Sequence, residues 1–93
     1  MTYGERLKKV RLSLELTQDE LAQSIGLKNK QTISDIETNK QKKLMEKNEE
    51  ILNGKYSVDM IWLKTGIGSM FLYDGNTVDD NGVVYLKLPI NTL

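Results

Sequence analysis

Two short helical patterns separated by a single glycine constrain this chain more than any other feature. Both lie in the segment TQDELAQSIGLKNKQTISDIE, residues 17–37. The first pattern begins with Thr17 and has Glu20 three residues later, which is the spacing of a capping box. Gly26 stands where a left-handed residue would end the helix. We therefore predict a short helix that stops at a tight turn and buries one apolar stripe, made of Leu21, Ala22 and Ile25.

The second pattern is polar over most of its surface. Asn29 is its predicted N-cap, and Asn39 can close the helix in a left-handed conformation. Ile33 and Ile36 are its only large apolar residues. The pattern therefore predicts a helix that buries two isoleucines and begins with a first turn that is polar all round.

The spacing of apolar residues predicts a further helix at the start of the chain. Tyr3, Leu7, Val10 and Leu14 fall at i, i+4, i+7 and i+11, which is one face of a helix over about 2–14. Most of the charged residues of this segment fall on other faces. We therefore expect an amphipathic first helix whose apolar face packs on the two patterns described above.

Two more helices complete the predicted fold. Apolar residues from Leu44 onward predict a helix that stops near Gly54, and Ser57 is the expected cap of a last helix that ends at 65–66. Residues 2 to about 66 are then five short helices. The predicted fold class is all-α, a compact five-helix bundle followed by a short C-terminal extended or β segment.

The C-terminal residues have a different character. Residues 74–82, DGNTVDDNG, are rich in turn formers, and residues 83–90, VVYLKLPI, have strand propensity. The strand could form a hairpin with residues 70–73. We divide the chain into a domain at 1–73 and a linker with a strand-like tail at 74–93. The tail would be either a dimerisation segment or the start of a further C-terminal domain.

The composition removes most catalytic chemistry. The 93 residues include no histidine and no cysteine, so the commonest general base, the commonest transition-metal ligand and thiolate zinc sites are all missing. A Gly-rich phosphate loop and a convincing carboxylate pair are missing too. We expect no enzyme activity, no metal and no cofactor.

The hydropathy of the chain predicts a soluble cytoplasmic protein. No apolar run approaches the roughly 20 residues that a membrane span needs. The amino-terminal residues also lack the apolar core of a signal peptide. We therefore expect no membrane partner.

Charge is distributed unevenly, although the net charge is zero. Residues 1–43 contain nine lysines and arginines and six acidic residues, which leaves a net charge of +3. Residues 44–93 contain four lysines and seven acidic residues, which leaves −3. Such asymmetry is more informative than the sum. The basic half contains the segment 17–37, which favours a nucleic-acid partner for that segment.

Two helices joined by a short turn that contains glycine form a helix-turn-helix. In the DNA-binding version, the second helix enters the major groove with its amino end first. This arrangement would explain the polar first turn of the second pattern, because side chains there must be long enough to reach base edges. Ile33 and Ile36 would anchor the helix from behind.

Residues 5–66 resemble the lambda-repressor-like helix-turn-helix domain of phage repressors, Cro proteins and related bacterial regulators. The segment WLKTGIGSMF at 62–71 resembles the part that closes this domain in many phage-type repressors. Two departures are visible: the stretch from Gly26 to Ile33 is one residue longer than the commonest spacing, and Asn39 replaces a frequent glycine. Each piece alone is a weak motif, and the combination is specific. The matching pieces are Arg11 followed by LTQDELA, Gly26, TIS-IE at 32–37, and Lys40.

The resemblance implies roles for individual residues. Lys30 and Gln31 match base-reading positions, and Ser34 and Asp35 lie one turn further along. Lysine can donate to guanine, glutamine can pair bidentately with adenine, and aspartate can accept from cytosine N4. The resemblance also implies contacts to DNA phosphates, for which the candidates are Gln18, Lys28, Thr32, Lys40, Lys42 and Lys43.

Two other implied roles concern structure. Gln18 matches a glutamine that contacts phosphate and can brace the second helix of the motif. Arg11 and Glu37 match an ion pair that ties the first helix of the domain to that helix. A plainer interpretation is that the polar candidates are only a solvated helix start and a soluble connection, and that they do not contact DNA. For Ser34 and Asp35 we favour this interpretation slightly.

The main hypothesis is a sequence-specific regulator that binds double-stranded DNA. It would be a phage-type repressor or the DNA-binding domain of one, and would occupy an operator as a homodimer. The alternative is a protein-binding module on the same fold, such as an antitoxin or the target of an anti-repressor. The acidic second half and the strand-like segment would suit a protein partner.

Overall fold

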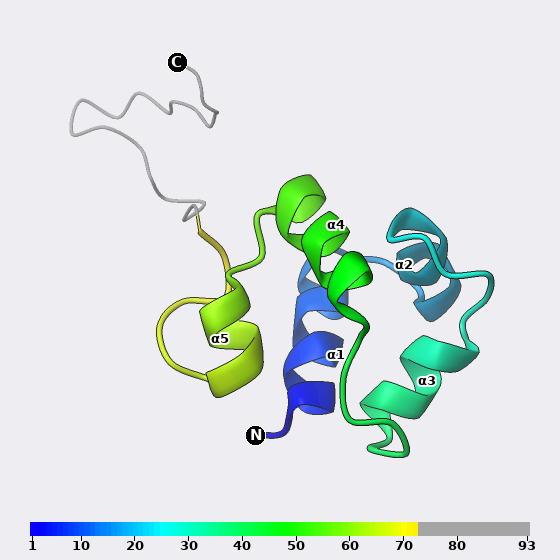
Figure 1. The fold of residues 1–93 in the computed structure, drawn as a ribbon, viewed down its shortest axis with the longest axis horizontal. Coiled ribbons are helices and arrows are strands. Elements are labelled where there is room, and N and C mark those ends of the chain that lie inside the picture. Colours follow the sequence, from blue (N-terminus) through cyan, green and yellow to red (C-terminus); the bar gives the residue numbers. More distant parts are fainter. Residues whose placement is uncertain (73–93) are drawn as a thin grey trace.

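The computed structural model describes residues 1–72 and contains five helices in that range (Figure 1). The predicted all-α, five-helix bundle is confirmed for this part of the chain. None of the described helices is long and apolar enough to cross a membrane. The helices are α1 (Tyr3–Ser13), α2 (Gln18–Ser24), α3 (Gln31–Glu37), α4 (Glu46–Tyr56) and α5 (Met60–Thr65).

Helix α1 is the central element of the bundle. It contacts α3 on one side and α5 on the other, and α2 packs on α3 (Figure 1). Each of the five helices places at least one apolar residue in the core at 0% exposure, and in α4 this residue is Leu52. Of the residues predicted to face inward from the first three helices, Tyr3 and Leu14 are half-buried. The others are fully buried: Leu7, Val10, Leu21, Ala22, Ile25, Ile33 and Ile36.

A close backbone approach between α1 and α3 requires glycine at position 4. A Cβ atom at Gly4 would collide with the carbonyl oxygen of Ile36. Only a residue without a side chain allows the two helices to lie this close. This contact sets the position of the carboxyl half of α3 against the core.

Local capping follows the sequence signals closely at α1 and α2. Thr2 and Thr17 each accept from the backbone N–H three residues later, and the glutamates at those positions, Glu5 and Glu20, complete both capping boxes. Gly26 has a φ of 91°, so α2 ends at a left-handed residue as predicted. Asn39, with a φ of 66°, has the predicted left-handed conformation after α3.

Helix α3 begins one residue later than predicted. Its N-cap residue is Lys30, which makes no side-chain cap hydrogen bond, and Asn29 lies one position before it. The Oδ1 atom of Asn29 accepts from the N–H of Gln31 at 2.9 Å. Asn29 therefore satisfies a free N–H of the first turn, but from outside the helix, because the longer turn delays the start of α3.

The predicted boundary between α4 and α5 was also wrong. Helix α4 continues past Gly54 to Tyr56, and Ser57 ends it in a left-handed conformation with a φ of 58°. Asp59 caps α5, accepting from the N–H of Ile61 at 2.8 Å. Asp59 lies two residues after Ser57 and competes with it for the cap of α5. The turn at Ser57 directs the carboxylate of Asp59 toward the free N–H groups of α5.

Residues 70–72 return to the start of α5. The N–H of Asp59 donates to the carbonyl of Met70 at 2.9 Å, and the N–H of Leu72 donates to that of Ser57 at 2.7 Å. Val58 and Phe71 form an isolated antiparallel bridge. The hairpin predicted between residues 70–73 and 83–90, the strand-like tail and the domain boundary at 73 involve residues outside the described part of the chain.

Two polar side chains of α1, the buried Arg6 and the half-buried Tyr3, tie this helix to distant elements. Arg6 donates from Nε to the carbonyl of Leu63 at 2.7 Å and from Nη2 to that of Lys64 at 3.1 Å. The hydroxyl of Tyr3 donates to Oε2 of Glu49 at 2.7 Å. Burial, with the carboxylate beside it, raises the pKa of the Tyr3 hydroxyl far above its ordinary value. The hydroxyl therefore stays protonated and able to donate.

Candidate nucleic-acid interface

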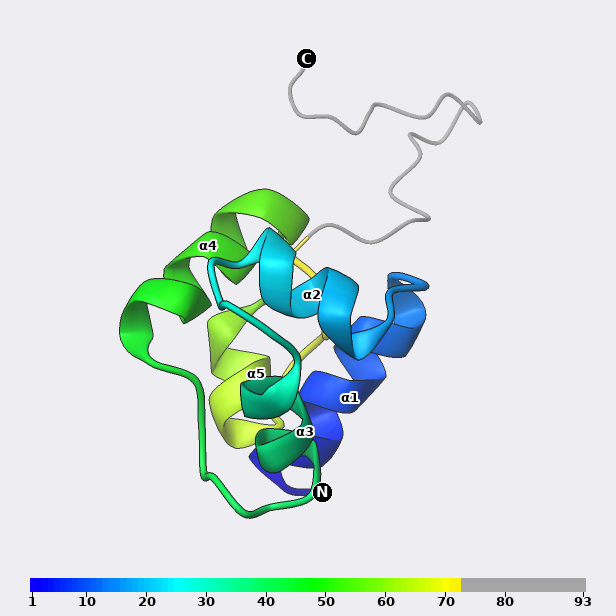
Figure 2. The same cartoon turned by 90° about the vertical axis from the view of Figure 1, so that its right-hand side faces the viewer.

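Helices α2 and α3 meet at a turn that begins with Gly26. The N–H of Leu27 donates back to the carbonyl of Ala22 at 2.8 Å, which closes the carboxyl end of α2. The chain then runs through residues 28–30 into α3. Figure 2 shows α3 on the outside of the molecule, with no other helix in front of it.

The amino end of α3 is exposed and its opposite face is buried. Lys30 and Gln31 are exposed, whereas Ile33 and Ile36 have 0% exposure. Thr32 is half-buried. The two isoleucines therefore hold the helix from behind and leave its first turn free to meet a partner.

The tip of Gln31 contacts Asp35 in the next turn of α3. Its Nε2 atom donates to Oδ1 of Asp35 at 2.9 Å. Ser34 and Asp35 are both half-buried. Asp35, which the sequence suggested as a direct reader of cytosine, thus already holds a hydrogen bond from the neighbouring candidate reader.

Three donors converge on the carboxylate of Glu37. Arg11 donates from Nε at 2.7 Å and from Nη2 at 3.1 Å, so the ion pair expected between these residues is formed with bidentate geometry. Gln18 donates from Nε2 at 3.0 Å. The Nη1 atom of Arg11 reaches the carbonyl of Leu16 at 3.0 Å. The carboxylate of Glu37 therefore joins the end of α3 to α1 and α2, and Arg11 also holds the segment between those two helices.

Gln18 lies at the first position of α2 and is half-buried. The sequence suggested both a phosphate contact and a brace to α3. The hydrogen bond to Glu37 is such a brace, and it reaches the last residue of α3 rather than the first. One hydrogen of the amide nitrogen remains for another acceptor.

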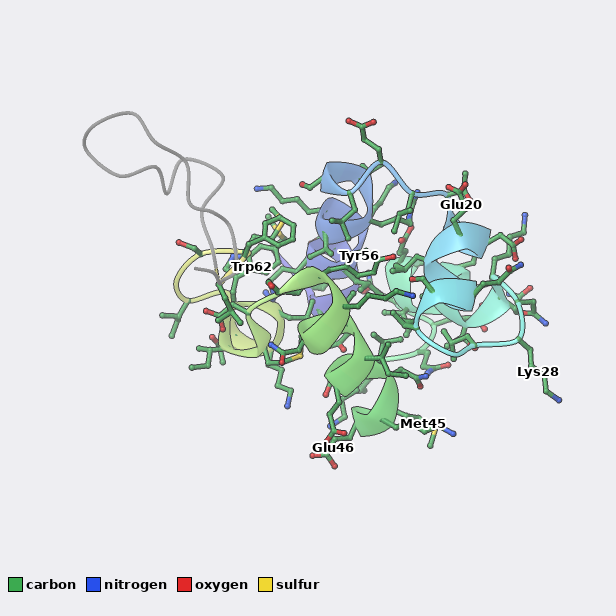
Figure 3. The ribbon with its side chains drawn as sticks, turned by 90° about the horizontal axis from the view of Figure 1, so that it is seen from above. Glu20, Lys28, Met45, Glu46, Tyr56 and Trp62 are labelled. Carbon is green, nitrogen blue, oxygen red and sulfur yellow. The ribbon has the colours of Figure 1, made fainter. Side chains whose placement is uncertain are left out.

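Exposed lysines flank α3 on both sides. Lys28 lies in the turn before it and points away from the helices (Figure 3). Lys40, Lys42 and Lys43 are exposed in the connection to α4, which makes a wide loop (Figure 2). The N–H of Lys40 donates to the carbonyl of Asp35 at 2.7 Å, so this connection starts in a fixed turn. Positive charge is therefore present before and after the exposed helix end.

The contact between Gln31 and Asp35 was missed from the sequence. Their spacing, four residues apart in one helix, could have indicated it. The brace from Gln18 to α3 was expected, but its acceptor, Glu37, lies 19 residues away in the chain and no local signal identifies it. Both features change the environment of a candidate DNA-contacting glutamine.

A family model described as helix-turn-helix matches residues 7–47, which run from α1 into α4 and include the whole of α2 and α3. This segment is a helix-turn-helix of the lambda-repressor-like family. No curated protein and no solved structure matched the chain. The helix-turn-helix match indicates a regulator of the DNA-binding type, and its family is not typically enzymatic.

Proposed function

We propose that this helix-turn-helix protein is a sequence-specific transcriptional regulator that places the amino end of α3 in the major groove of double-stranded DNA. The observation that carries the proposal is the exposure of Lys30 and Gln31 in front of the fully buried Ile33 and Ile36. A polar, exposed helix end on a rigid support is what base readout requires. We assign base contacts to Lys30 and Gln31.

Phosphate contacts would fix the helix in the groove. We assign them to residues on either side of α3, because contacts to both walls of the groove set its register. Gln18 is included since one amide hydrogen remains beside the bond to Glu37. The proposed set is Gln18, Lys28, Thr32, Lys40, Lys42 and Lys43.

The proposed mechanism is occupation of an operator, as in a phage-type repressor. Blocking polymerase by occupancy requires tight, specific binding and no chemistry. We propose that the protein acts as a dimer, with recognition helices about 34 Å apart on successive turns of the groove. Ile61 and Ile67, in and just after α5, are 64% and 70% exposed. Their exposure supports a dimer in which α5 and the residues after it form the contact between the two copies. Residues 1–73 would then be the DNA-binding unit.

Selection of bound sequences from a random double-stranded library tests this function directly. We expect a palindromic site whose half-sites are centred about 10 base pairs apart. Enrichment of a single half-site would support DNA recognition by α3 and reject the proposed dimer. Failure to retain any DNA at low salt would reject the proposal and favour a protein-binding module.

A further inference from the structure

We propose that Asp35 is a positioning residue that sets Gln31 to read adenine, and that Asp35 does not read a base itself. This inference rests on the proposed function, since it concerns how the same helix end discriminates between bases. It replaces the direct contact to cytosine that the sequence suggested for Asp35.

Gln31 is held at two points before any DNA arrives. Its side-chain Nε2 donates to Oδ1 of Asp35 at 2.9 Å, and its backbone N–H donates to Oδ1 of Asn29 at 2.9 Å. The residue is exposed and is the first residue of α3. The bond to Asn29 fixes the backbone of Gln31. An exposed glutamine would otherwise sample several rotamers, so the bond to Asp35 restricts a side chain that solvent alone would leave free.

Asp35 stands on a backbone that the following turn fixes. Its carbonyl oxygen accepts from the N–H groups of Lys40 and Gln41 at 2.7 and 3.1 Å. The side chain is half-buried, in contrast to the exposed Gln31. The carboxylate is therefore the more rigid member of the pair, and the amide takes its orientation from it.

The charge of the carboxylate decides which end of the amide faces it. An ionised carboxylate can only accept, so Nε2 must point toward Asp35, and the reversed amide would bring Oε1 against the negative charge. One Nε2 hydrogen and both lone pairs of Oε1 then remain for a base. Adenine offers an acceptor at N7 and a donor at N6, which matches this set.

Guanine does not match the oriented amide. Its major-groove edge carries acceptors at both N7 and O6. A freely rotating glutamine could turn its nitrogen toward either acceptor, but an amide held by Asp35 keeps Oε1 on one side and meets an acceptor there. The Gln31–Asp35 pair should therefore favour adenine over guanine more strongly than Gln31 alone. Ordering the side chain in advance also removes part of the entropic cost of binding.

Two variants separate positioning from charge. Asp35→Ala removes both the acceptor and the charge, whereas Asp35→Asn removes the charge and retains an oxygen that can accept from Gln31. Both should bind random DNA more tightly, because a negative charge near phosphates is gone. Asp35→Ala should lose preference for adenine over guanine by about three- to tenfold, the value of one ordered side chain. Asp35→Asn should lose a smaller part of it, because an asparagine amide can accept from Nε2 of Gln31 but can also donate to its Oε1.

The position of the lost preference discriminates between the mechanisms. Starting from the selected site, each base pair is changed in turn and affinity is measured for the wild type, Asp35→Ala, Asp35→Asn and Gln31→Ala. We expect Asp35→Ala and Gln31→Ala to lose discrimination at the same base pair. A loss at a different base pair would show that Asp35 reads a base, and an unchanged profile would also overturn the proposal. If the wild-type protein selects no DNA sequence, the proposed function itself is rejected.

A measurement on the free protein tests the positioning without DNA. The side-chain amide of Gln31 should show a lower ¹⁵N order parameter in Asp35→Ala than in the wild type. Gln23 is the internal reference, since its Nε2 donates to Oδ2 of Asp19 at 3.1 Å in the same four-residue spacing. Equal mobility of Gln31 in both proteins would overturn the inference even where sequence-specific binding is intact.

Discussion

Glu37 and Arg11 form a bidentate ion pair with a shortest distance of 2.7 Å, and it joins the end of α3 to α1. The two side chains are only 4% and 11% exposed. The same carboxylate holds Gln18 at the start of α2. The orientation of the proposed recognition helix therefore depends on one nearly buried charge as well as on its isoleucines.

Glu37→Ala should lower the free energy of unfolding by about 3–5 kcal/mol, because it leaves the guanidinium of Arg11 nearly buried and unpaired. Urea unfolding followed by circular dichroism measures the change. Glu50→Ala, at an exposed position of α4, is the control and should stay within about 0.5 kcal/mol of the wild type. A similar small effect at Glu37 would mean that the ion pair contributes little to the fold.

Gly4→Ala should destabilise the protein by more than about 1 kcal/mol, because the added methyl group forces α1 away from α3. Gly54→Ala is the matched control. Its Cβ would meet nothing within 4 Å, and it lies within α4, so alanine there should stabilise by about 0.5–1 kcal/mol. Thermal unfolding of both variants measures the difference, and equal melting temperatures would contradict the close approach.

Gln31→Ala should cost about 1–3 kcal/mol on the selected site and relax preference at one base pair. The physical reason is the loss of a bidentate contact from an exposed, oriented amide. Gln23→Ala, an exposed position of α2, should leave the binding profile unchanged. Competition binding compares affinity for the selected site with affinity for random DNA. Equal losses of affinity for both would refute base readout by Gln31.

Lys40→Ala should weaken binding to all sequences alike and lower the salt slope of log K by about one, as expected for one lost phosphate contact. Lys55→Ala is the control. Lys55 lies in the last turn of α4, at the end of that helix away from α3 (Figure 1). Titration of binding between low and moderate salt gives the slope. An unchanged slope for Lys40→Ala would remove this residue from the phosphate contacts.

The Tyr3 hydroxyl should make stability fall at alkaline pH. Its pKa is raised in the folded state, so its contribution is complete below the ordinary tyrosine pKa of about 10 and is lost progressively as pH rises above that value. Unfolding free energies measured from pH 8 to 11 should decline less steeply in Tyr3→Phe than in the wild type. At pH 8 the same variant should be less stable by about 1–3 kcal/mol, because the buried Glu49 loses a hydrogen-bond donor. Parallel pH profiles of the wild type and Tyr3→Phe would contradict the raised pKa of the Tyr3 hydroxyl.

Prediction from the sequence succeeded where a signal lies within a few residues. The capping box at Thr17 and the left-handed residues Gly26 and Asn39 were predicted correctly, because short-range geometry decides such features. It failed at Ser57, because Asp59 caps α5 instead. At α3, Asn29 supplies the capping hydrogen bond, although the helix begins one residue later than predicted. The direction of the incoming chain decides where a helix begins and which residue caps it, and that direction is set by packing.

The sequence by itself determined the five helices, the isoleucines that anchor the third of them and the polar character of its first turn. Periodicity and capping are local, so one chain read in order is sufficient for these features. Only the tertiary structure decided that one carboxylate, that of Glu37, would accept from both Arg11 and Gln18, and that Arg6 and Tyr3 would make hydrogen bonds to distant helices. These partners lie far apart along the chain, and they meet because burial of the apolar core brings their helices together.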